Sequence, residues 1–171
     1  MTKKLSEFPD QAACACRMCV DACSHKPGWL APGDAEAIAT YAGVTLEELF
    51  KTKLIVDWYG GGPKGDIFVL SPAKEGEPAG EMSGSNPVGV CVFLKDDLCQ
   101  IHAVKPAECK KATHPVVVPK GEQSPMRGLH GAVAAAWDTP ENQKQIEDLL
   151  GEPPHAQYYS IFDTLSWIRR R

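Results

Sequence analysis

The sequence has no long apolar run and no excess of basic charge, and both absences exclude classes of protein. No segment approaches the length of apolar chain that spans a bilayer, so no membrane association is expected. Lys and Arg total 18 against 22 Asp and Glu, and this net charge of -4 argues against a nucleic-acid-binding protein that relies on a basic surface. No apolar stretch follows the first lysines, as it would in a secretory signal, so the chain is expected to be cytoplasmic.

Two motifs of common cofactor chemistry are also missing. The stretch GGGPKG at residues 60–65 lacks the Lys-Ser/Thr ending and the strand–helix context of a phosphate-binding P-loop. The spacing Cys16-x-x-Cys19-x-x-x-Cys23 has its longer gap second, whereas the radical-SAM motif has the longer gap first. Neither a P-loop nucleotide site nor radical-SAM chemistry is therefore predicted.

Cysteine is the residue type that the chain does have in unusual number. Seven cysteines cannot all pair within one chain, and cytosolic thiols are kept reduced, so structural disulfides are not expected. Two explanations remain: metal ligation or redox chemistry, and buried packing thiols. The first is the leading one because the odd number of cysteines and the reducing compartment both disfavour disulfides. The cysteines also fall into two separated groups, as the ligands of a metal site that joins distant segments do.

The length of 171 residues predicts one domain, residues 1–171, with a mainly α-helical fold and a small β element (α+β), compact and organised around a cysteine-ligated metal centre. IVDWY and DIFVL, on either side of the glycine-rich stretch, predict a hairpin of two strands. Thr45 and Glu48 have the form of a capping box, which predicts a helix that starts at Leu46.

The rest of the chain divides by composition. Residues 71–89 are rich in Pro, Gly and Ser and predict a long loop of the kind that forms a lid or a partner site. VCVFL at residues 90–94 predicts a short strand, and AVKPAECKKA predicts a helix with Pro106 in its first turn. Residues 128–171 predict a C-terminal helical region.

The cysteines have the spacing of metal ligands. Cys16, Cys19 and Cys23 stand at i, i+3 and i+7, which is one stripe of a helix, and Cys16-x-x-Cys19 is a common chelating unit. The alternative is that small buried thiols line the core face of that helix. The second group is distant in sequence and consists of Cys91, Cys99 and Cys109.

CRMCVDAC, followed at a distance by CVFLKDDLCQIHAVKPAECKKATHP, resembles the YkgJ-like cysteine-cluster family, a zinc- or iron-chelating domain often written CxxCxxCC. The resemblance covers residues 14–115, the expected metal-binding region. Matching positions in the second block are Cys91, Phe93, Leu94, Cys99, Ile101, Pro106, Cys109 and Pro115. The ligands that the resemblance implies are Cys16, Cys19, Cys23, Cys91, Cys99 and Cys109.

The chain departs from the family pattern at several positions. Ala22-Cys23 stands where the family has two adjacent cysteines, and lysines stand where the second block has arginines. Cys14, His102 and His114 lie close enough in sequence to the two cysteine groups to be further candidate ligands. His130 is interpreted as an ordinary surface or packing residue.

Six thiols are too many for one zinc ion, which takes four ligands. The related domain also occurs in a flagellin lysine-methylating enzyme, which implies an iron–sulfur cluster, and a 4Fe–4S cluster is therefore preferred to zinc. The first hypothesis is a metal-cluster protein with a redox, electron-transfer or structural role and a redox or protein partner. The alternatives are a zinc-binding adaptor or metal-trafficking protein, and a small iron–sulfur oxidoreductase or protein-modifying enzyme with an open metal site. The oligomeric state and the catalytic residues are left open.

Overall fold

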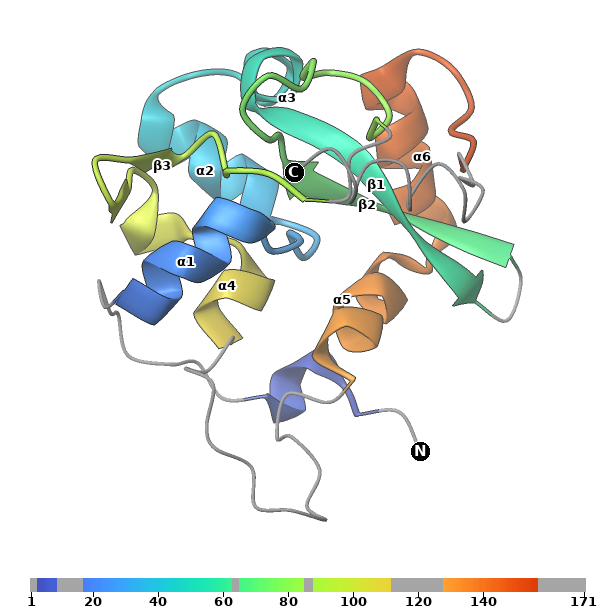
Figure 1. Cartoon of the computed structure of the whole chain (residues 1–171). Coiled ribbons are helices and arrows are strands. Elements are labelled where there is room, and N and C mark those ends of the chain that lie inside the picture. Colours follow the sequence, from blue (N-terminus) through green and yellow to red (C-terminus); the bar gives the residue numbers. More distant parts are fainter. Residues whose placement is uncertain (1–2, 9–16, 63–64, 85–87, 112–127, 157–171) are drawn as a thin grey trace, which may run out of the picture.

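The computed structural model describes residues 3–8, 17–62, 65–84, 88–111 and 128–156, which form a small α+β domain (Figure 1). The strands pair as two antiparallel hairpins, β1–β2 and β3–β4. Over the described residues the helices are η1 (Leu5–Glu7), α1 (Arg17–His25), α2 (Asp34–Ala42), α3 (Leu46–Lys53), η2 (His102–Val104), α4 (Ala107–Lys111), α5 (Leu129–Trp137) and α6 (Pro140–Leu150). The strands are β1 (Leu54–Gly62), β2 (Gly65–Pro72), β3 (Leu94–Lys95) and β4 (Leu98–Cys99).

The β1–β2 hairpin is the central element, and its prediction from the sequence is confirmed. Its register pairs Leu54 with Pro72 and Trp58 with Phe68. The β-branched and aromatic side chains of both strands favour this extended, half-buried conformation. Helices α5 and α6 pack against β2, and α3 packs against β1. Figure 1 shows α1, α4 and β3 together on the side of the molecule opposite α6.

The ends of the helices follow from local chemistry. The side chain of Thr45 accepts a hydrogen bond from the backbone N–H of Glu48 at 3.1 Å, so the predicted helix start is confirmed. Thr139 caps α6 in the same way, and Pro140 occupies the first helical position. Gly43 ends α2 with a φ of 71°, a left-handed conformation that glycine adopts without strain.

A hydrophobic core, and not a metal centre, organises this fold. The largest fully buried side chains include Trp29, Trp137, Phe8 and Phe50, and they belong to one continuous cluster. The indole N–H of Trp137 donates to the carbonyl oxygen of Leu30 at 2.7 Å, which satisfies its polar atom inside this cluster. In the described ranges no group of three or more His, Cys, Asp and Glu side chains could hold a metal ion. The prediction of a domain organised around a cysteine-ligated metal centre is therefore wrong.

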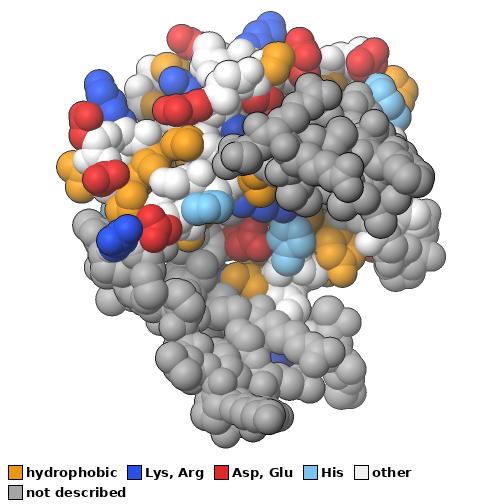
Figure 2. Space-filling view, viewed as in Figure 1, with side chains coloured by type: hydrophobic (Ala, Val, Ile, Leu, Met, Phe, Trp, Pro, Cys, Tyr) orange, Lys and Arg blue, Asp and Glu red, His pale blue; other side chains and the backbone are white. Residues whose placement is uncertain are grey.

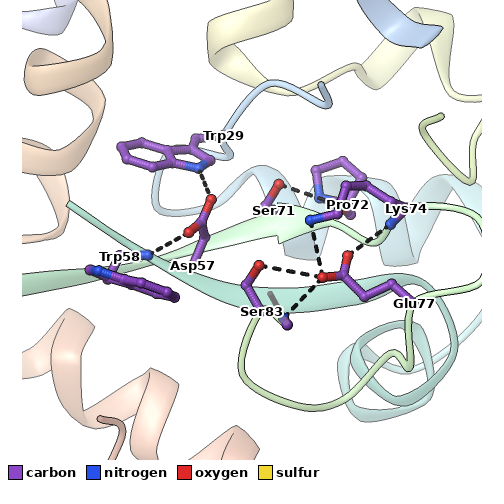
Figure 3. A network of polar contacts seen from close by, with 9 residues as sticks. Trp29, Asp57, Trp58, Ser71, Pro72, Lys74, Glu77 and Ser83 are labelled. Atoms are coloured by element: carbon purple, nitrogen blue, oxygen red, sulfur yellow. Dashed lines mark hydrogen bonds and ion pairs between the residues drawn. The ribbon is translucent and has the colours of Figure 1, made fainter. Parts of the chain in front are cut away.

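The segment 71–89 begins as part of β2 and is then held by a buried ion pair. Lys74 Nζ lies 3.0 Å from Glu77 Oε1, and both side chains are only 9 % exposed. Glu77 also accepts hydrogen bonds from the Ser83 hydroxyl and the Gly84 backbone N–H (Figure 3). One carboxylate thereby ties both ends of the turn together, and Met82 forms a bridge to Val56 in β1.

Residues 90–94 do not form the strand that was predicted. Cys91 forms an isolated bridge with Lys74, and the chain then turns, so that β3 begins only at Leu94. The hairpin β3–β4 turns at Asp96 and Asp97, which both have positive φ values of 50° and 59°. This tight turn brings Cys99 into register with Leu94.

Candidate functional site

Four cysteines with described side chains come from four segments of the chain. Cys23 lies in α1, Cys91 precedes β3, Cys99 lies in β4 and Cys109 lies in α4. The backbone N–H of Cys91 donates to the carbonyl oxygen of Cys23 at 2.9 Å, which joins the end of α1 to the segment before β3. The β3–β4 register then carries Cys99 back toward Cys91.

Cys109 is held against Gly28 in the turn after α1. A Cβ atom added to Gly28 would lie 2.6 Å from Cys109 Sγ and 3.1 Å from the Cys109 backbone nitrogen. No side chain fits there without movement of α4, so glycine is required by this close approach. The backbone N–H of Gly28 forms a hydrogen bond with the sulfur of Cys109.

The two most enclosed thiols are strongly biased toward their neutral form. The pKa of Cys91 is raised to about 12, mainly by burial; the proximity of Cys23 and Cys99 adds to this shift, and the backbone N–H of Phe93 opposes it. Burial also raises the pKa of Cys109, and nearby Cys23, Cys91 and Glu108 add to that shift. Each of these thiols thus lies close enough to others to feel their charge.

Burial raises the pKa of Cys23 and Cys99 as well, and Cys99 contributes to the shift at Cys23. The ammonium group of Lys105 acts in the opposite direction on both thiols. A cation therefore stands beside the more exposed half of the group. These four residues, Cys23, Cys91, Cys99 and Cys109, are called the thiol cluster below.

The thiol cluster fits a thiophilic metal in chemistry but not as a ready-made site. Thiolates are the ligands that zinc and iron–sulfur clusters prefer, and the four sulfurs influence one another electrostatically. Among the described side chains, however, no set of three ligands is arranged to hold an ion. Deprotonation of the buried thiols and a local closing of the cluster would both have to accompany metal binding.

The other predicted ligands are only partly covered by the structure. Cys16, Cys14 and His114 lie outside the described residues, and Cys19 lies in α1 without a described side chain. His102 begins η2, and its Nε2 is buried without a hydrogen-bond partner among the described residues. The structure describes four of the six predicted cysteine ligands, and a metal-binding role for all six stays a prediction.

A second polar group was missed by the sequence analysis. The ring of His130 is stacked on Trp29 with centroids 3.3 Å apart, and its Nδ1 lies 2.8 Å from Glu108 Oε1. Tyr59 meets both rings edge-on. These residues come from α5, the turn after α1, α4 and β1, and no spacing in the sequence connects them. Figure 2 shows that histidine, acidic and basic side chains lie near one another on the face viewed in Figure 1.

Comparisons with protein-family models, with curated proteins and with solved structures find no match for this chain. The resemblance to the YkgJ-like family therefore stays a prediction that rests on the cysteine pattern. In the portion of the chain that is described, no helix is both long and apolar enough to cross a membrane.

Proposed function

We propose that the chain is a metal-cluster-binding protein that carries a cysteine-ligated 4Fe–4S cluster with a redox, electron-transfer or structural role. The observation that supports this proposal is the thiol cluster, in which the pKa values of Cys23, Cys91 and Cys109 are each raised in part by another thiol of the cluster. Cys91 belongs to the edge of the hydrophobic core, and Cys23 and Cys99 pack against it, so the thiols gather at one side of this core.

The sulfurs are positioned by contacts that do not involve the metal. The backbone bond between Cys91 and Cys23 and the close approach of Gly28 to Cys109 hold the cluster in its place. Lys105, beside Cys23 and Cys99, would offset part of the negative charge that the thiolates acquire. When bound, an iron–sulfur cluster would supply reversible one-electron chemistry.

The resemblance to the YkgJ-like family supports the same proposal, because its ligand positions include all four residues of the thiol cluster. It adds Cys16 and Cys19 as ligands from the same stretch as Cys23. The proposal includes a cytoplasmic location and a redox or protein partner. It includes no nucleic-acid binding. A reducing compartment would keep the thiols available for metal.

Zinc is the second candidate, and one observation favours it. The thiol cluster contains four described cysteines, which is the number of ligands that a structural zinc ion takes. Bound in this way, zinc would make the chain an adaptor, or a trafficking protein if the metal exchanges readily. The further alternative is a small iron–sulfur oxidoreductase or protein-modifying enzyme with an open metal site.

Single serine variants test which thiols bind metal. Cys23→Ser, Cys91→Ser and Cys109→Ser are each expected to lower the bound metal per chain after anaerobic reconstitution, because oxygen is a poorer ligand for these soft metals. Ser24→Ala is the matched control, since the Ser24 hydroxyl bonds the carbonyl oxygen of Val20 and not a thiol. Equal metal content in all four variants and the parent chain would contradict the proposed ligand set.

A further inference from the structure

The imidazole of His130 is held in one orientation by contacts with two other side chains. Its ring lies 3.3 Å from the Trp29 ring, with an angle of 24° between their planes. Its Nδ1 lies 2.8 Å from Glu108 Oε1. A stack on one side and a carboxylate at one nitrogen leave the ring little rotational freedom.

The partners of His130 are themselves held in place. The second oxygen of Glu108 accepts a hydrogen bond from the backbone N–H of Trp29 at 2.7 Å. The indole N–H of Trp29 donates to Asp57 Oδ2 at 2.8 Å, as Figure 3 shows. Trp29 is only 1 % exposed, so the platform under His130 belongs to the core. The orientation of the imidazole is therefore set by the whole fold.

These contacts determine the state of the free nitrogen. Because both oxygens of Glu108 act as acceptors, Nδ1 of His130 is the donor in this contact, so the lone pair of the neutral imidazole lies on Nε2. The side chain is 40 % exposed, and within the described residues Nε2 forms no hydrogen bond. An oriented, accessible imidazole with its lone pair outward has the form of a general base.

A hydroxyl donor lies beside this base. The ring of Tyr59 is centred 6.1 Å from that of His130, and its hydroxyl oxygen is 3.3 Å from where a Cβ atom on Gly131 would stand. Among the described residues the Tyr59 hydroxyl has no hydrogen-bond partner. A base and a free O–H thus border the same part of the surface.

We propose that His130 and Tyr59 form an acid–base site that hydrolyses carboxylic esters, separate from the thiol cluster. Nε2 of His130 takes a proton from water, the water oxygen bonds to the ester carbonyl carbon, and the C–O bond to the alcohol breaks. The alcohol oxygen then takes the proton from Nε2, which gives one carboxylic acid and one alcohol. Tyr59 donates a hydrogen bond to the carbonyl oxygen, and Glu108 is a positioning residue that accepts the Nδ1–H and holds the imidazole in place.

The reaction needs neither metal nor an oxidant, so it stands or falls independently of the proposed metal function. Hydrolysis of 4-nitrophenyl acetate by the metal-free chain under reducing conditions is the assay. His130→Asn is the central variant, because the Asn amide can still donate to Glu108 while the free nitrogen is removed. His25→Asn is the control, since His25 bonds only a backbone carbonyl of its own helix and is exposed.

The parent chain and His25→Asn are expected to hydrolyse the ester at the same saturable rate, with His130→Asn slower by about a hundredfold. Glu108→Gln and Tyr59→Phe are each expected to lower kcat with KM unchanged. Equal rates in His130→Asn and the parent chain, or an equal loss in His25→Asn, would overturn the proposal. If His130→Asn does not fold, diethyl pyrocarbonate labelling of the parent chain decides. The proposal requires His130 to react faster than His25, and slower reaction refutes it.

Discussion

Gly28→Ala should disturb the thiol cluster and little else, because Gly28 is the point at which the turn after α1 meets Cys109. The new Cβ atom would lie 2.6 Å from Cys109 Sγ, 3.1 Å from the Cys109 backbone nitrogen and 3.2 Å from Glu108 Cβ. Two of these atoms are close to the backbone of α4, so the helix itself must move. Overpacking of this kind lowers the free energy of unfolding by about 1–3 kcal/mol.

A compensating gain reduces this loss. Gly28 does not have a positive φ, so alanine can adopt its backbone conformation. Alanine also lowers the conformational entropy of the unfolded chain, which stabilises the folded state by about 0.4–1 kcal/mol. The net expectation is a loss of about 1–2 kcal/mol in the free energy of unfolding. Urea denaturation of the reduced, metal-free chain, followed by tryptophan fluorescence, measures it.

Gly84→Ala is the matched control for this substitution. The nearest atom to its new Cβ is Glu77 Oε1 at 3.8 Å, which is an ordinary contact. Gly84 likewise lacks a positive φ, so we expect Gly84→Ala to leave the free energy of unfolding unchanged or to raise it by up to about 1 kcal/mol. A Gly28→Ala variant as stable as Gly84→Ala, with the same reactivity of Cys109 toward a thiol reagent, would refute the packing of α4 described above.

Three further predictions concern the ion pair, a helix cap and a thiol. Glu77→Gln leaves Lys74 buried without its charge partner and should lower the free energy of unfolding by about 3 kcal/mol, whereas exposed Glu75→Gln should leave the urea midpoint unchanged. Thr139→Ala removes an acceptor at 3.2 Å and should lower thermal stability by about 1 kcal/mol. The Cys91 thiol has an ordinary pKa of 9.0 and a folded pKa of about 12, so the unfolded chain loses its proton first and stability falls as pH rises between these values. Cys91→Ser should remove about 1 kcal/mol of the loss measured in urea at pH 10, and an unchanged pH dependence would contradict the burial of this thiol.

The features that the sequence predicts correctly are local ones. The β1–β2 hairpin and the cap at Thr45 depend on residues that are near neighbours in the chain, and their patterns are direct consequences of backbone chemistry. The strand predicted at residues 90–94 failed for a non-local reason. Cys91 pairs with Lys74 and with the end of α1, and these partners replace a regular ladder.

The candidate sites divide in the same way. The spacing of the cysteines and the resemblance to the YkgJ-like family predict the residues of the thiol cluster as metal ligands, and this role stays a prediction. The same cysteines wrongly predicted a metal-organised fold, since cysteine content says nothing of whether the apolar residues already suffice for a core. His130 was missed because Glu108 and Trp29 lie far from it in sequence and meet it only through packing.

Metal and sulfide analysis of the whole chain, purified without oxygen, tests the central claim most directly. A visible spectrum recorded on the same sample distinguishes iron–sulfur from zinc. The proposal predicts a coloured protein with iron and acid-labile sulfide in equal amounts, about four of each per chain, and bleaching by reductant. A colourless protein with one zinc per chain would support the adaptor alternative and reject the cluster. Protein that takes up neither metal would contradict a metal-binding role for the thiol cluster altogether.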